Sequence, residues 1–68
     1  MVESEPLNEL LQVDVDLDII NEVAQRNNMG AGGLKGLFTM GKVYNPTEDQ
    51  ENAIREAVRI QRKRERNN

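Results

Sequence analysis

Three aspartates, Asp14, Asp16 and Asp18, are the first residues whose type and spacing could do chemistry. Carboxylates at alternate positions open an EF-hand loop, where they ligate one calcium ion. That loop also needs glycine at its sixth position and a bidentate glutamate at its twelfth, where this chain has Ile19 and Gln25. The aspartates therefore predict a solvated acidic edge and a helix N-cap rather than a metal site.

A second pattern, from Gly36 to Lys42, has the glycine and lysine spacing of a phosphate-binding P-loop. In that loop the next residue is serine or threonine, whose hydroxyl binds magnesium, but here it is Val43. The segment that begins at Gly30 also departs from the dinucleotide-binding spacing, because Lys35 stands where the third glycine belongs. We therefore expect no nucleotide and no other cofactor.

The chain contains no cysteine and no histidine. This composition excludes disulfides, a cysteine or histidine nucleophile and a Ser-His-Asp triad, and it removes the usual ligands of zinc and haem. The remaining acids form no pair that the sequence places in an evidently buried setting. We therefore expect a protein that is not an enzyme, with no catalytic or metal-binding residues and no small-molecule substrate.

One basic cluster lies near the C-terminal end of the sequence. It comprises Arg59, Arg62, Lys63, Arg64 and Arg66. Cations at this density can neutralise the phosphates of nucleic acid, but no aromatic residue lies among them to stack on bases, and the formal net charge of the chain is −3. Three interpretations stay open: a helix end that complements the helix dipole, a contact with nucleic acid, and a site for an acidic protein partner.

Charge is divided unevenly along the chain. Residues 1–28 hold seven acidic side chains and one basic one, whereas residues 29–68 hold eight basic and five acidic ones. Such a division predicts head-to-tail complementarity between copies of the chain, or a basic end that meets an acidic partner.

Two amphipathic helices are expected to carry the fold. The first covers residues 16–28, with Asp16 or Asp18 as its N-cap and an apolar stripe that includes Leu17 and Ile19. Residues 13–18 alternate apolar and acidic, which taken alone is typical of a strand, but the helical spacing that starts at Leu17 favours a helix for their second half.

The second helix covers residues 46–64. Asn45 is its predicted N-cap, Pro46 its first residue and Glu48 its third. Its apolar stripe consists of Ala53, Ile54, Ala57, Val58 and Ile60. No apolar residue follows Ile60, so residues 61–68 are expected to form a basic, frayed tail.

Two shorter segments complete the chain. Leu7, Leu10 and Leu11 follow Pro6 at helical spacing and predict a short helix, which either caps the protein's own core or docks in a partner's groove. Residues 29–44 hold all five glycines between apolar residues. This segment is expected to be a Gly-rich apolar connector that holds a short helix around residues 34–40.

These elements predict an all-α fold, with residues 1–68 forming a single small helical domain. A 68-residue chain with 3% aromatic residues has little material for a core, so we expect it to bury apolar surface against itself in a homo-oligomer or against another protein. The apolar residues expected to bind that partner are Leu34, Leu37, Phe38, Tyr44, Ile54 and Val58.

The function predicted from the sequence is that of a small non-enzymatic protein-interaction module, a regulatory or assembly factor that docks through amphipathic helix faces. One alternative is a nucleic-acid-binding accessory protein that uses the basic C-terminal cluster, and a weaker one is a small structural subunit of a large assembly. No apolar run approaches the ~18 residues of a membrane span and no signal-peptide core follows Met1. We therefore expect a cytoplasmic protein without a membrane partner.

Overall fold

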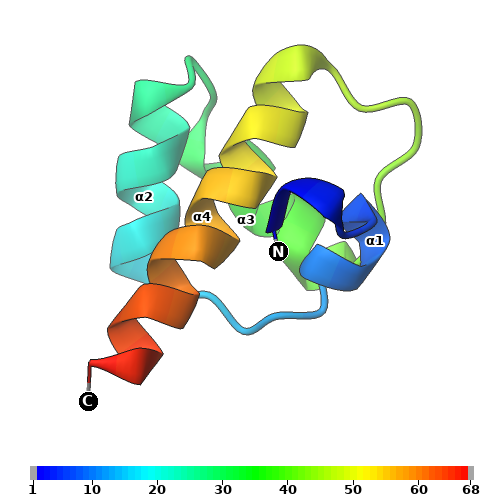
Figure 1. The fold of residues 1–68 in the computed structure, drawn as a ribbon. Coiled ribbons are helices and arrows are strands. Elements are labelled where there is room, and N and C mark those ends of the chain that lie inside the picture. The colour runs from blue at the N-terminus through cyan, green and yellow to red at the C-terminus, as the bar shows by residue number, and fades with distance from the viewer. Residues whose placement is uncertain (1, 68) are drawn as a thin grey trace.

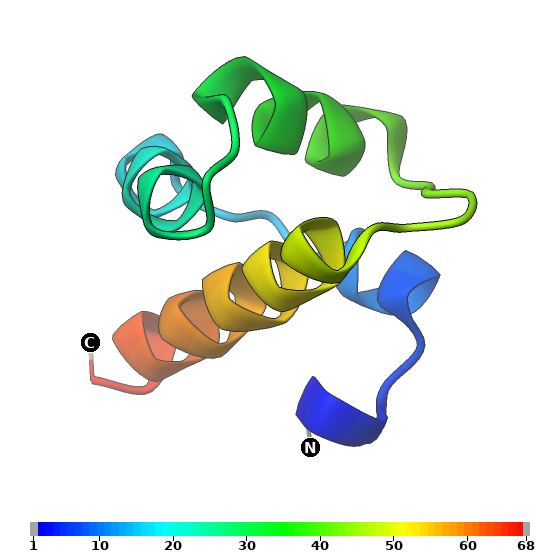
Figure 2. The same cartoon turned by 90° about the horizontal axis from the view of Figure 1, so that it is seen from above.

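The computed structural model describes residues 2–67, which form five helical elements around the longest of them (Figures 1 and 2). They are the 3-10 turn η1 (Val2–Ser4) and the helices α1 (Leu7–Leu10), α2 (Leu17–Arg26), α3 (Ala31–Met40) and α4 (Glu48–Arg66). The described residues contain no strand, which confirms the all-α prediction. None of these helices is long and apolar enough to cross a membrane.

α4 is the element on which all the others pack. It contacts η1, α1, α2 and α3, and Figure 2 shows α2 and α3 on one side of it with η1 on the other. Four residues of its predicted stripe, Ala53, Ile54, Ala57 and Val58, are fully buried in the core. The fifth, Ile60, is only partly buried against it. The i, i+3, i+4 spacing of these residues aligns them on one face, and that face fixes the position of the helix.

The remaining elements each contribute one side to the same core. The largest of their fully buried side chains are Leu10, Leu11, Val23 and Leu34. Leu10 and Leu11 lie at the end of α1, which packs on α4. The leucine-rich segment therefore caps the protein's own core.

The start of α4 differs from the prediction by two residues. Thr47, rather than Asn45, is the N-cap, and it forms a capping box with Gln50. The Thr47 hydroxyl accepts a hydrogen bond from the Gln50 amide at 3.1 Å, and the Gln50 side-chain oxygen accepts one from the Thr47 amide at 2.9 Å. This box satisfies two backbone donors at once, which an Asn45 cap with Glu48 at its third position does not do here.

The end of α4 also differs from the prediction. The helix continues to Arg66 instead of fraying over residues 61–68, of which Asn68 lies outside the described residues. Gln61 is 5% exposed, and its side chain bonds the backbone amide of Asp16. Tertiary contacts therefore hold these polar turns, which have no apolar stripe of their own.

α2 and α3 are joined by a tight turn, because α2 ends at Arg26 and not at residue 28 as predicted. Asn28 adopts the left-handed conformation at φ 56°, and the amide of Met29 donates to the carbonyl oxygen of Ala24 at 2.9 Å, a bond typical of a Schellman helix end. The Asn27 side chain donates to Glu56 in α4 at 2.9 Å. The turn is thus fixed both locally and against α4.

α3 is longer than the short helix predicted for residues 34–40, because its helical residues begin at Ala31. Glycine disfavours helix, but Leu34 is buried and Leu37 and Phe38 pack partly against the core. Packing of these three side chains outweighs the low helix propensity of the glycines. The helix ends at Gly41, whose φ of 72° suits glycine.

Candidate protein interface

The six apolar residues predicted to bind a partner divide into two groups. Leu34, Ile54 and Val58 have no exposed surface, because α3 and α4 turn these side chains toward the core. The structure therefore corrects the prediction for these three, which hold the fold together and offer nothing to a partner. Leu37 and Phe38 keep part of their surface, and Tyr44 in the α3–α4 loop is 75% exposed.

A groove lies between the α1–α2 loop, the start of α2 and one flank of α3. Its volume is about 270 Å³. It is lined by Val13, Asp14, Val15, Leu17, Ile20, Lys35, Phe38 and Thr39. Its surface is polar and apolar in about equal parts, and the two charged residues bring opposite charges.

Leu17 is the residue of this groove that the sequence misplaced. It was expected on the buried stripe of the helix, yet it is 55% exposed. Ile19, Ile20, Val23 and Ala24 make the core contacts of α2, and at ~100° per residue Leu17 lies about 90° from the centre of that set. It therefore stands at the edge of the stripe, facing the groove.

A second surface is formed by four arginines on one face of α4. Arg55, Arg59, Arg62 and Arg66 follow the spacing i, i+4, i+7, i+11, which places them along one side of a helix. We call this face the arginine ridge. Arg55 lies outside the basic cluster predicted from the local density of charge, but the helical spacing connects it to the other three arginines.

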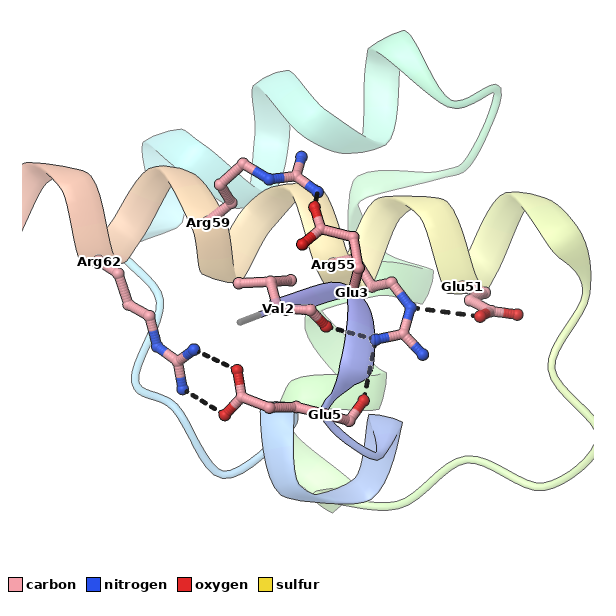
Figure 3. Close-up of polar contacts among 7 residues, drawn as sticks. All are labelled: Val2, Glu3, Glu5, Glu51, Arg55, Arg59 and Arg62. Carbon is pink, nitrogen blue, oxygen red and sulfur yellow. Dashed lines mark hydrogen bonds and ion pairs between the residues drawn. The ribbon is translucent and has the colours of Figure 1, made fainter.

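Residues 2–5, which we call the N-terminal arm, lie across the arginine ridge (Figure 3). Arg62 donates to both carboxylate oxygens of Glu5, at 2.5 and 3.1 Å, and Arg59 donates to Glu3 at 2.6 Å. Arg55 donates to the backbone carbonyl oxygens of Val2 at 2.6 Å and of Glu5 at 2.9 Å. The ridge thus binds the arm through both its side chains and its main chain.

These contacts shift the pKa values of the two carboxyl groups of the arm. Hydrogen bonds from Arg62 lower the pKa of the Glu5 carboxyl, and Glu5 in turn raises the pKa of Arg62. The pKa of the Glu3 carboxyl is lowered by a hydrogen bond from its own backbone amide and then by Arg59. Both carboxylates are therefore held in their ionised form.

Arg64 lies off the ridge and faces the start of α2. It donates to Asp16 at 2.9 Å and to both oxygens of Asp18 at 3.0 and 2.9 Å, and these bonds lower the pKa of the Asp18 carboxyl. Arg64 thus binds two of the three aspartates whose spacing resembles a calcium loop. Within residues 2–67, no three acidic side chains converge on a point where a metal ion could bind.

The uneven division of charge is resolved within one chain. Glu3, Glu5, Asp16 and Asp18 from the acidic half each pair with an arginine of α4. These pairs use the complementarity that the sequence analysis assigned to contacts between copies. Of the five predicted basic partner-binding residues, Arg59, Arg62 and Arg64 are paired in this way. Lys63 and Arg66 form no ion pair in the part of the chain that the structure describes.

The segment that resembles a P-loop does not form a loop. It is helical from Gly36 to Met40 as part of α3, so its backbone amides are directed along the helix and cannot surround a phosphate.

The chain matches no protein-family model, and comparisons with curated proteins and with solved structures find no significant match.

Proposed function

We propose that this chain is a small non-enzymatic protein-interaction module, a regulatory or assembly factor that binds another cytoplasmic protein in the groove beside α3. The supporting observation is Leu17, which is 55% exposed at the groove edge in a chain with few large apolar side chains. Burial of an aliphatic side chain of this size stabilises by about 1.5–3 kcal/mol. Because Leu17 is 55% exposed, a partner that covers it gains about half of this contribution, roughly 1 kcal/mol.

The dimensions and charges of the groove favour a peptide side chain as its occupant. Its volume of about 270 Å³ lies below the ~300–1,000 Å³ of sites for small molecules. An amphipathic helix places single apolar side chains in grooves of this kind. With Asp14 and Lys35 among the lining residues, the fitting helix carries an apolar anchor flanked by one basic and one acidic residue.

The nucleic-acid alternative has less support than a protein partner. Arg59, Arg62 and Arg64 each bind a carboxylate of the chain itself, which reduces the positive charge available to neutralise phosphates. A structural subunit of a large assembly is a variant of the same proposal, in which the partner in the groove is permanent.

Two exposed apolar residues allow a matched test. Leu17→Gln changes the groove, whereas Met40→Gln changes a residue that is 70% exposed and does not line the groove. We expect the wild type and Met40→Gln to capture the same partner from native cells, and Leu17→Gln to lose it. Retention of the partner by Leu17→Gln contradicts the proposal.

Sedimentation of the purified chain identifies the other possible occupant. If the wild type sediments as a dimer and Leu17→Gln as a monomer, the groove holds a second copy of this chain. That result contradicts a separate partner protein, because the two occupants compete for one surface.

A further inference from the structure

The N-terminal arm occupies the arginine ridge in the way that a bound peptide would (Figure 3). We propose that the ridge is a docking surface for acidic peptide segments of other proteins, and that the arm covers it when no such segment is bound. η1, which contains part of the arm, lies across α4 from α3 (Figure 2). This proposal is therefore independent of the partner proposed for the groove.

The contacts define the kind of peptide that fits. Arg59 and Arg62 bind carboxylates two residues apart, Glu3 and Glu5. Arg55 binds main-chain carbonyl oxygens, which every peptide carries. Val2 adds a small apolar side chain that is 8% exposed against the core. The fitting segment therefore has an apolar residue and two acids, which stand at the first and third positions after it.

The arm is held weakly enough for another peptide to replace it. Val2 is the one buried side chain of the arm. The side chains of the Glu3–Arg59 pair are 60% and 51% exposed, and those of the bidentate Glu5–Arg62 pair are 29% and 40% exposed. Exposed ion pairs contribute little to stability and are screened by salt. Leu10 and Leu11 hold the chain to the core just after the arm, so the arm can leave without disturbing the helices.

The ridge also has capacity beyond the arm. A hollow of about 400 Å³ is lined by Val2, Glu3, Arg59, Arg62 and Arg66. Arg66 forms no ion pair within residues 2–67, so a longer acidic segment can gain one more charge-assisted hydrogen bond there.

Peptide is favoured over nucleic acid as the occupant. The half-buried guanidinium of Arg55 is directed at carbonyl oxygens, which the main chain of every peptide supplies. The side chains that line the hollow include no aromatic residue on which bases could stack. An acidic peptide supplies carboxylates for Arg59 and Arg62 and carbonyl oxygens for Arg55.

The test uses the full chain and a labelled peptide with the sequence of residues 2–9, followed by fluorescence anisotropy. The double variant Glu3→Gln with Glu5→Gln loosens the arm and leaves the ridge intact. Glu48→Gln with Asp49→Gln changes the net charge equally at the other end of α4, and is the matched control. Removal of the arm's carboxylates raises the fraction of molecules with an open ridge, so we expect about tenfold tighter peptide binding by the arm variant.

Further measurements test the proposal. The charge-matched control should bind like the wild type, and Arg59→Ala with Arg62→Ala added to the arm variant should abolish binding while the circular dichroism melt stays cooperative. Equal affinity in the wild type and the arm variant overturns the proposal, as does equal binding of a peptide with glutamine for glutamate. Tighter binding of a 16-base-pair duplex than of the peptide also overturns it, because it identifies the ridge as a nucleic-acid surface.

Discussion

The side-chain oxygen of Gln61 accepts a hydrogen bond from the backbone amide of Asp16 at 2.9 Å, across 45 residues of chain. Gln61 is 5% exposed, the one polar residue among those buried in the described chain. Its amide nitrogen donates to Glu65 at 3.3 Å, so both ends of this side chain have partners. The bond fixes the last turns of α4 against the first residues of α2.

Gln61→Leu should therefore destabilise the protein. The substitution leaves the Asp16 amide without its acceptor in a partly buried setting, at a cost of about 1–3 kcal/mol. Urea denaturation measures the change, with Gln25→Leu on the exposed face of α2 as a near-neutral control. An unchanged midpoint for Gln61→Leu would show that water replaces the bond without loss.

Asn27→Ala should weaken the junction between the α2–α3 turn and α4. The Asn27 side chain donates to Val23 at 2.8 Å and to Glu56 at 2.9 Å, and loss of such bonds costs about 1 kcal/mol. Asn21→Ala, at an exposed position of α2, should leave thermal stability unchanged or slightly higher. Equal melting temperatures for the two variants would contradict a role for Asn27 in the junction.

Glycine substitutions in and after α3 should act in opposite directions. A Cβ at Gly32 or Gly36 would meet nothing within 4 Å, so alanine there should stabilise by about 0.5–1 kcal/mol through helix propensity. At Gly41, φ is +72° and a Cβ would lie 2.9 Å from the Gln12 side-chain nitrogen. Gly41→Ala should therefore destabilise, by about 1–2 kcal/mol for the left-handed backbone alone. Chemical denaturation of the three variants checks the signs.

Low pH should weaken the ion pairs that hold the arm and the first residues of α2 to α4. The pKa values of Glu3, Glu5 and Asp18 are lower in the folded chain than their ordinary values of 4.5, 4.5 and 3.8. The unfolded chain therefore takes up protons first, so this contribution is complete above about pH 4.5 and is lost as pH falls through the folded pKa values. Glu3→Gln with Glu5→Gln should lose less stability than the wild type between pH 6 and pH 3. Parallel losses in the two proteins would contradict the prediction.

The positions of the helices followed from the sequence where apolar spacing decides them. The apolar stripe of α4 predicted which face of that helix is buried. The cap of α4 was less certain, because Asn45 to Glu48 and Thr47 to Gln50 both have the residue types of a capped start. Only the side-chain bonds of Thr47 and Gln50 distinguish the two.

The candidate surfaces were harder to predict than the fold. Composition shows that the two halves of the chain carry opposite charges, but it cannot show that Glu5 meets Arg62 in the same molecule. Exposure of Leu17 depends on how α2 rotates to bury Ile19 and Ile20 together, which is a property of the assembled core. Local patterns do not contain such long-range pairings.

The contact between the N-terminal arm and α4 has a consequence for the order of folding. α3 precedes α4 directly, whereas Val2 and Arg55 are separated by 53 residues when they bond. The contacts of the arm are partly exposed ion pairs and one buried side chain, whereas the helical body holds the rest of the core, so the body should order first and the arm should dock last. In amide exchange, the arm should open by local unfolding far more often than the body unfolds. An arm that opens takes Val2 out of the core and uncovers the arginine ridge, so the concentration of a competing ligand should set the fraction of open molecules.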